Sequence, residues 1–490
     1  MKQYIFKRIL VMIPTFFAIT LIIFLILQVA PGRPGGAEGG DSESTKQGGM
    51  DGYRIYKQQF HLDKPILLNT RVFNFELLFF SVGIQDSEVQ NLLRDKFNAQ
   101  GDNRTKLKNY ATETLQDYGN YILPHLARII ASPSEPELLG YALKVFRENA
   151  QRPLIHEYGV RLTEEQKMLN GQIEEENKKV SKFIYRDTMS ETEKRLLVDK
   201  VLDYYTKISI RFEYSFWNKI KVMFFDTRFA KYITNLVNLN FGISFVDKRP
   251  VLPKIMERLQ YSIALSGVSI LITYLLAIPI GIYSAVFPKT LSDQGMTVVL
   301  FMLYSLPTFF VGTVLLFLFS EGSDFESLRV FPTSGFHSLN FNDLTVLQKF
   351  FDIVWHMFLP LVCLTYISLA SLSRYARTGL LDVIHSDYIK TARAKGLNEW
   401  VVILKHAVRN GLIPILTLLG SILPTVVSGS VIIEVIFNLP GIGLEGYQAV
   451  LNRDYNMVMA IQLISAVLTL IGLLISDILY AVVDPRITYN

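Results

Sequence analysis

The chain has 490 residues, of which 50% are hydrophobic and 19% carry a charge. Such a high apolar content, gathered into long blocks, excludes an ordinary soluble domain and indicates a membrane protein. The net charge of +5 is modest, so composition gives no reason to expect a nucleic-acid partner.

Six blocks of mostly uncharged residues are each long enough to cross the roughly 30 Å hydrocarbon core of a bilayer as a helix. They lie at residues 9–30, 259–287, 295–320, 353–373, 412–436 and 457–483. We therefore expect an all-α membrane protein with six transmembrane helices.

The first block could be read as a secretion signal, because basic residues precede it at Lys2, Lys7 and Arg8. Its apolar run is longer than that of a signal peptide, and no paired small residues mark a cleavage site. We expect a retained helix with a cytoplasmic N-terminus, which also places the C-terminus in the cytoplasm. Basic residues then concentrate in the cytoplasmic loops, whereas the outside loop at 437–456 carries only Arg453.

Between the first and second blocks, residues 67–226 hold about half of all the charged residues in about a third of the chain. A glycine-rich stretch at 34–40 precedes this segment and is typical of a flexible linker. We expect three parts: residues 1–66 as the first helix and an external linker, 67–226 as an inserted all-α extracytoplasmic domain, and 227–490 as the remaining five helices.

Local signals support helices inside this insertion. Three helix-start signatures begin at Ser134, Thr163 and Ser190, each with an acidic or amide side chain three residues later. After the last one, apolar residues recur at helical spacing and predict one buried face formed by Leu197, Val201, Tyr205 and Ile208.

Two further parts of the insertion have their own patterns. Residues 121–130 and 138–147 predict a helical hairpin that faintly resembles a single unit of a helical repeat. Residues 214–225 mix aromatic residues with Lys219 and Lys221, which fits either a helix lying in the lipid headgroup region or an ordinary amphipathic core helix. Both interpretations of 214–225 stay open at this stage.

A short basic segment between the fourth and fifth blocks stands out. Residues 387–394 favour helix, Gly396 supplies a residue that tolerates the left-handed conformation, and a second helix is expected through Trp400 to Arg409. The simplest alternative is an amphipathic connector whose basic residues face anionic lipid. The segment holds the residues that we expect to act together: Asp387, Tyr388, Thr391, Ala392, Arg393, Ala394, Lys395, Gly396, Leu397, His406, Arg409 and Asn410.

Several motifs together resemble the B-type permease subunit of dipeptide and oligopeptide ABC importers, over about residues 1–66 and 227–490. They are DYIKTARAKGL at 387–397, HAVRN at 406–410, NFGIS at 240–244, RPVL at 249–252, EVIFNLPGIG at 434–443, RDY at 453–455 and DPR at 484–486. The phrases at 441–447 and 476–480 are similar to the branch that imports oligopeptides and microcin C-type compounds. The wider ABC-importer signature has Glu where Lys390 stands and Pro where Arg409 stands, so the segment follows the peptide subfamily, with Pro414 as the later proline.

This resemblance implies a bacterial inner-membrane protein of the type I importer fold that passes peptides across the membrane. The expected partners are a second homologous permease, two ATP-binding cassette subunits docked at 387–410, and an extracytoplasmic solute-binding protein. ATP and Mg²⁺ would bind to the partner subunits, and this chain would hold no cofactor and no metal. A junction is also implied, because 63–66 and 228–232 look like neighbouring parts of one family segment separated by the insertion.

The remaining candidates are single residues. Glu434 and Asp477, near the ends of spans, fit either a substrate pathway or a structural hydrogen bond. Pro414 and Pro424 are possible gate residues, although prolines in membrane helices more often kink without gating. Cys363 is expected to be a packing residue.

No phosphate-binding loop, metal-ligand spacing or hydrolase motif occurs in the sequence, so we do not expect an enzyme. The alternative function is a membrane-anchored scaffold or sensor with an external helical receptor domain. The two functions differ in one respect, because a scaffold needs no ATPase-coupling segment.

Overall fold

The computed structural model describes residues 2–29, 57, 61–77, 80–98, 104–133, 135–155, 162–212, 214–322, 324–411, 415 and 430–483. The chain divides into two compact units. The first unit comprises residues 1–37 and 243–490, and the second comprises residues 38–242. The boundaries expected at 67 and 226 both lie inside the second unit.

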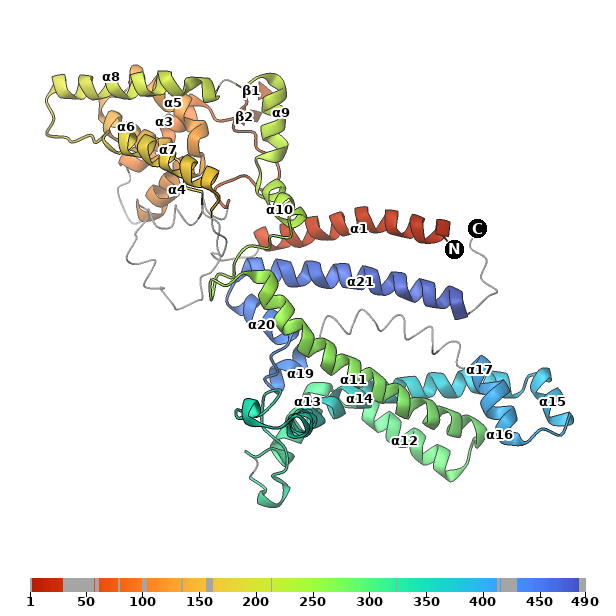
Figure 1. Ribbon diagram of the computed structural model, residues 1–490. Coiled ribbons are helices and arrows are strands. Elements are labelled where there is room, and N and C mark those ends of the chain that lie inside the picture. The colour runs from red at the N-terminus through yellow and green to blue at the C-terminus, as the bar shows by residue number, and fades with distance from the viewer. Residues whose placement is uncertain are drawn as a thin grey trace. The chain divides into compact units, whose positions relative to one another are not determined.

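The first unit is helical (Figure 1). Its long helices are α1 Lys2–Val29, α11 Val251–Val286, α12 Leu291–Ser305, α13 Thr308–Phe319, α14 Val346–Ile384 and α21 Tyr455–Val483. Its shorter elements are η4 Glu326–Leu328, η5 Phe341–Asp343, α15 Asp387–Ala394, α16 Glu399–Val401, the π-helix η6 Val402–Ala407, α17 Val408–Gly411, α19 Val431–Ile436 and α20 Ile442–Leu451.

Within the described residues, four helices are long and apolar enough to cross a membrane, namely α1, α11, α14 and α21. They coincide with four of the six expected spans. The expected span at 412–436 lies mostly outside the described residues. Pro414 and Pro424 both lie outside them.

The expected single span at 295–320 is instead two helices, α12 and α13, that meet at an angle of 96°. Leu306 at the break has extended backbone angles, and Pro307 follows it. A proline ring pushes the preceding residue out of the helical conformation and removes one backbone donor, so the helix stops there. The pair is either one broken span or a re-entrant loop.

Small residues let α11 and α14 pack side by side (Figure 1). Ser269, Thr273, Ala277, Gly281 and Ala285 recur every fourth residue along α11, and all are buried. A Cβ atom at Gly281 would lie only 2.3 Å from the Cβ of Ala376 on α14. The stripe therefore allows the two backbones to approach closely, as small residues commonly do between membrane helices.

The second unit is mainly helical and carries one hairpin (Figure 1). Strands β1 Asn74–Leu77 and β2 Phe80–Gly83 pair antiparallel, with Asn74 opposite Gly83, which departs from the all-helical expectation. The helices are α3 Asp86–Asn98, α4 Arg104–Asp117, η1 Gly119–Ile122, α5 Leu123–Ala131, η2 Pro136–Leu138, α6 Leu139–Ala150, α7 Glu164–Ser181, α8 Glu191–Ile208, η3 Ser209–Phe212, α9 Phe216–Phe225 and α10 Arg228–Val237.

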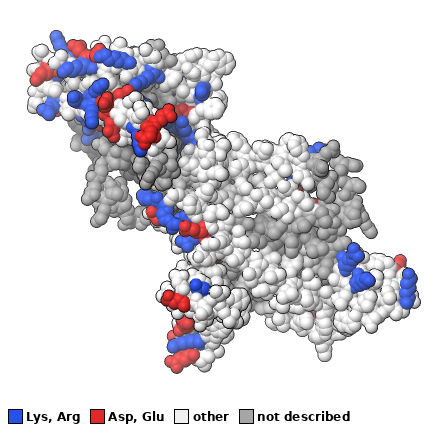
Figure 2. All heavy atoms as spheres, in the orientation of Figure 1, with Lys and Arg blue, Asp and Glu red and all other residues white. Residues whose placement is uncertain are grey.

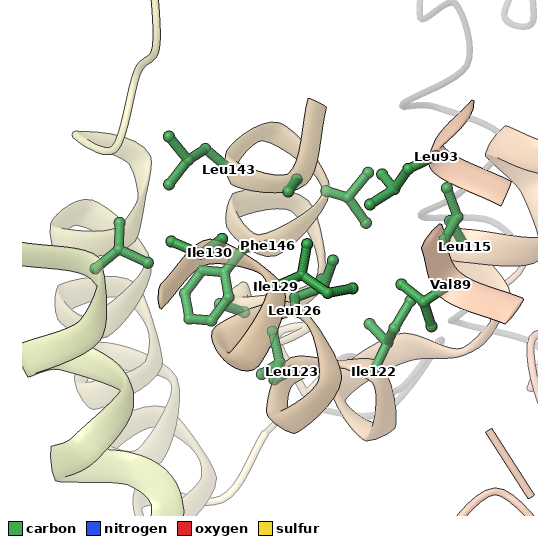
Figure 3. Close-up of a cluster of buried hydrophobic side chains, with 14 of the residues drawn as sticks. Val89, Leu93, Leu115, Ile122, Leu123, Leu126, Ile129, Ile130, Leu143 and Phe146 are labelled. Carbon is green, nitrogen blue, oxygen red and sulfur yellow. The ribbon is translucent and has the colours of Figure 1, made fainter. Parts of the chain in front are cut away.

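The helices of the second unit surround a hydrophobic core of their own (Figure 3). Its centre is formed by fully buried side chains of α5 and α6, among them Leu126, Ile130, Leu143 and Phe146. The expected helical hairpin is thus confirmed as α5 packed on α6. A core of this size makes the unit a folded domain and excludes a disordered tail.

The expected helix starts are confirmed at Thr163 and Ser190, each of which forms a reciprocal capping box with the side chain three residues later. Ser134 lies outside the described residues. On α8, Leu197, Val201 and Ile208 are buried and Tyr205 packs against them at the edge of the core. The apolar face expected from spacing therefore points inward.

Charged side chains crowd the surface of the second unit, whereas the helices of the first unit show mostly uncharged residues (Figure 2). Many charges of the second unit form exposed pairs, such as Lys207 with Asp203. Such pairs contribute little to stability. Their charged groups are hydrated, as is usual on a surface that faces water. The second unit is therefore built for an aqueous environment, and the helices of the first unit for lipid.

Candidate functional site

The basic segment after α14 forms two short helices joined by a tight turn. Helix α15 ends where Gly396 takes a positive φ of 75°, and the Gly396 amide donates to the Arg393 carbonyl at 3.0 Å. The next helix begins at once, because the Asn398 side chain accepts a hydrogen bond from the Trp400 amide at 3.0 Å. We call residues 387–411 the coupling segment.

One face of the coupling segment is buried. Ile389, Ala392, Val402 and Ala407 form a hydrophobic cluster with residues at the ends of α11 and α14, namely Ala285, Leu380 and Ile384. Close packing transmits displacement between the elements that share it. The segment is thus fixed to two membrane-spanning helices.

The opposite face exposes large apolar side chains. Trp400 is 61% exposed and Leu404 is 54% exposed, and Tyr388, Leu397 and Val401 are exposed beside them. Figure 2 shows basic side chains gathered over the same end of the first unit, where Lys390, Arg393 and Lys395 are exposed. A cluster of exposed apolar residues with a basic rim is typical of a protein-binding surface.

An ion pair holds the two helices at the turn. Arg393 Nη2 lies 2.6 Å from Glu399 Oε1, and both side chains are about half exposed. The hydrogen bonds from Arg393 lower the pKa of Glu399 below its ordinary value. Because the pair is solvated, its role is to orient the turn, and its contribution to stability is small.

The coupling-segment residues expected from sequence lie in one compact region. Asp387, Tyr388, Thr391, Arg393, Ala394, Lys395, Gly396, Leu397, Arg409 and Asn410 are exposed, His406 is half-buried, and Ala392 is buried in the inner cluster. Asn410 donates to the Tyr388 hydroxyl at 3.0 Å, which ties the last helix of the segment to the first.

Sequence reasoning did not include Trp400, Leu404 and Glu399 among the site residues. Trp400 and Leu404 are four residues apart on one helical face, and this apolar spacing beside the buried Ile403 was the available signal. No comparable signal predicts the pairing of Glu399 with Arg393, because the two residues lie on different helices on either side of the turn.

A buried ion pair near the same end of the first unit was also missed. Arg377 Nη2 on α14 lies 2.8 Å from Asp293 Oδ2 at the start of α12, and Asp293 is only 2% exposed. The Lys289 amide donates to the same carboxylate oxygen at 2.9 Å. Arg377 thereby connects the turn before α12 to the helix that carries the coupling segment.

Glu434 and Asp477, the two acids near span ends, both have structural partners. Asp477 Oδ2 on α21 lies 2.9 Å from Arg8 Nε on α1, and these two helices pack side by side. Glu434 is buried on α19 and accepts hydrogen bonds from the Ser262 hydroxyl at 2.8 Å and the Leu444 amide at 3.0 Å. Both carboxylates thus make contacts that hold neighbouring elements of the first unit together.

Gly441 must be a glycine because of Glu434. A Cβ atom at Gly441 would lie 2.4 Å from Glu434 Oε2 and 2.6 Å from Ser262 Oγ. The glycine lets the backbone close over the buried carboxylate, and this closure fixes the loop between α19 and α20.

Two of the sequence motifs meet in space although they are far apart in the chain. Ser244 donates its hydroxyl to Asp454 Oδ2 at 2.5 Å, and Asn456 donates its side-chain amide to the Ile243 carbonyl at 2.8 Å. Ser244 and Asp454 are both buried. These contacts join the segment before α11 to the start of α21.

The two ends of the insertion also meet, within the second unit. The Arg228 amide donates to the Pro65 carbonyl at 2.9 Å, and the Phe229 amide donates to the Ile66 carbonyl at 3.1 Å. The resemblance implied that 63–66 and 228–232 are neighbours, and the backbone hydrogen bonds place them together. A domain can be inserted at such a point without separating its flanks.

Comparison with known proteins agrees with this architecture. Residues 277–489 match the model of the family described as binding-protein-dependent transport system inner membrane component. The chain is 41% identical over 265 residues to the oligopeptide transport system permease protein AppB of Bacillus subtilis, a match that covers 54% of this chain and 80% of that protein.

Two other relatives give similar results. Identity is 36% with the peptidoglycan transport system permease protein YejB of Agrobacterium fabrum, over 54% of this chain and 72% of that protein. It is 33% with the dipeptide transport system permease protein DppB of Escherichia coli K12, over 54% and 81%. Each match covers most of the relative and about half of this chain. The chain therefore belongs to the family of inner-membrane permeases of peptide ABC transport systems.

Proposed function

We propose that the chain is one of two permease subunits in an ATP-driven importer of oligopeptides or peptide-like compounds in the bacterial inner membrane. Two ATPase subunits would dock on the coupling segment, and they would hold the ATP and Mg²⁺. A solute-binding protein would deliver peptide on the outer side, where we place the second unit. The names of the relatives support the transported class, since they include oligopeptide and dipeptide permeases.

The observation that carries this proposal is the two-faced coupling segment. Its inner face packs on the ends of α11 and α14, and its outer face presents Trp400 and Leu404. Aromatic anchors with a basic rim are common at the energetic centre of protein interfaces. A partner that pulls or pushes on the outer face would move two spans.

The mechanism follows from this geometry. Closure of the ATPase pair would bring two coupling segments together, and each segment would carry its α11 and α14 ends with it. The buried Asp293–Arg377 pair would pass the same displacement to α12. Such packed helices have few arrangements, so the spans would switch between an outward-open and an inward-open state.

Purification of the full-length chain from native membranes tests the proposal. We expect an ATPase subunit and a second permease to copurify, and peptide uptake by cells to depend on the chain. A stable complex without any ATPase would favour the scaffold or sensor and overturn the importer.

We further propose that the second unit and the loop at 437–456 contact the delivery protein. Deleting residues 67–226 while keeping the junction residues Asp63 and Arg228 tests this point. Reduced affinity for the solute-binding protein is expected. Unchanged affinity and unchanged uptake would defeat the assignment.

A further inference from the structure

The first unit holds a pocket of about 350 Å³, lined by both polar and apolar residues, beside the loop between α19 and α20. Its volume lies within the usual range of small-molecule sites. Arg258, Asn438, Glu445 and Gln448 are among the residues that line it.

The walls of the pocket are held in place. Glu434 and Ser262 fix the loop that carries Asn438, since the Ile442 amide donates to Ser262 Oγ at 2.8 Å and Ser262 donates to Glu434. The opposite wall is joined to α19, because the Gly335 amide donates to the Phe437 carbonyl at 3.1 Å. A preformed pocket with a fixed shape binds a ligand at a low entropic cost.

Arg258 and Glu445 line the pocket, and their charges are balanced together with those of Lys254 and Asp247 beside it. Lys254 Nζ lies 2.7 Å from Glu445 Oε1 and 2.9 Å from Asp247 Oδ2, and both Lys254 and Glu445 are buried. Arg258 Nε lies 3.2 Å from Glu445 Oε2. Each oxygen of Glu445 thus faces one cation, and the four groups together carry no net charge.

Arg258 keeps unused binding capacity. Its side chain is 32% exposed and lines the pocket, and none of its nitrogens makes a hydrogen bond to the described part of the chain. A guanidinium can grip a carboxylate with two parallel hydrogen bonds.

The amide side chains of Asn438 and Gln448 are exposed at the rim, and each can both donate and accept hydrogen bonds. The main chain of a peptide also offers both a donor, its N–H group, and an acceptor, its carbonyl oxygen. We propose that this pocket binds the C-terminal end of the transported peptide, with the terminal carboxylate on Arg258. This inference rests on the proposed function and names the part of the substrate that the permease recognises.

The test compares matched substrates. Cells that carry the chain as their only copy receive a pool of radiolabelled peptides, once as free acids and once as C-terminal amides. Arg258→Gln should raise the KM for the free acids about tenfold or more, since a charge-assisted hydrogen bond is lost. The KM for the amides should change less than about twofold. Arg249→Gln is the control and should change neither KM, because it removes an exposed pair with Glu257 and neither residue lines the pocket.

Arg258→Lys is a second variant that keeps the positive charge, so it is less liable to disturb folding than Arg258→Gln. It loses the two parallel hydrogen bonds of the guanidinium, so an intermediate KM for free acids supports the proposal. Equal effects of Arg258→Gln on acids and amides would overturn it, and so would no effect on either. Failure of the wild-type chain to support any ATP-dependent uptake would instead reject the proposed function.

Discussion

Lys64 and Asp226 are 162 residues apart in the chain, and their side chains form an ion pair at 3.0 Å. Asp226 also accepts a hydrogen bond from the Tyr121 hydroxyl at 2.5 Å and from the Asn69 side chain at 3.2 Å. The start, the core and the end of the insertion thus converge on one carboxylate. These contacts hold the first and last residues of the insertion together.

The junction should depend on pH in a defined direction. Burial opposes ionisation of Asp226, but the charge of Lys64 and the hydrogen bonds outweigh it and lower the pKa of Asp226. A carboxyl group with a lowered pKa stabilises the folded state above its unfolded pKa, near 3.9, and this contribution is lost as the pH falls through the folded value. We expect the Arg228 and Phe229 amides to be protected from hydrogen exchange at neutral pH, and this protection should weaken below about pH 4.

Hydrogen exchange of the full-length chain in nanodiscs, corrected for intrinsic rates, measures this protection. Asp226→Asn should lower it about tenfold at neutral pH, because partly buried Lys64 loses its partner. Asp203→Asn, in an exposed pair, is the matched control. Wild-type protection at neutral pH in the Asp226 variant would contradict this role.

Trp400→Ala should weaken binding of the ATPase subunit. Truncating an exposed aromatic anchor at the centre of an interface typically costs about 2 kcal/mol or more, which is at least about a 30-fold loss of affinity. Trp217→Ala is the control, because Trp217 is 75% exposed and lies in the second unit. Affinity measured on purified complexes should fall for Trp400→Ala alone; an equal result for both variants would refute the interface.

Gly396→Val should uncouple ATP hydrolysis from uptake. A Cβ atom at Gly396 meets nothing within 4 Å, so the change introduces no clash, but the φ of 75° costs a non-glycine residue about 1–2 kcal/mol. A β-branched residue would therefore shift the turn. Gly295→Val on α12 also has open space and no positive φ, and it serves as the control. Substrate-stimulated ATPase activity should drop only in the Gly396 variant, and normal coupling there would reject the turn as a coupling element.

Gly441→Ala should destabilise the loop between α19 and α20. The added methyl group would overlap the Glu434 carboxylate, and crowding of this kind commonly costs about 1–3 kcal/mol. At Gly446 the nearest atom to an added Cβ is 3.7 Å away, so Gly446→Ala should be tolerated. Thermal unfolding in detergent compares the two, and equal Tm values would show that the Glu434 contact is not required.

Local patterns allowed much of this fold to be predicted. The capping boxes at Thr163 and Ser190, the apolar face of α8 and four spanning helices depend on residues close in sequence, and the structure has all of them. The turn at Gly396 was also predictable, because the sequence there combines helix-forming residues with one glycine.

Other features depend on residues that are distant in sequence. Three pairs form only when the helices pack, so no regular spacing in the sequence predicts them. They are Arg8–Asp477, Asp293–Arg377 and Ser244–Asp454. Pro307 accounts for the break between α12 and α13, but the 96° angle of the bend depends on how α13 packs against α14 and α19. The sequence likewise could not tell which face of the coupling segment is buried.

Labelling of a single cysteine tests most directly whether the coupling segment faces the cytoplasm. The native Cys363 is buried in α14, so Lys395→Cys supplies the accessible thiol. A membrane-impermeant maleimide should label this variant in inside-out vesicles and leave it unlabelled in intact cells. Labelling from the outside of intact cells would place the segment beyond the reach of any ATPase and contradict the account.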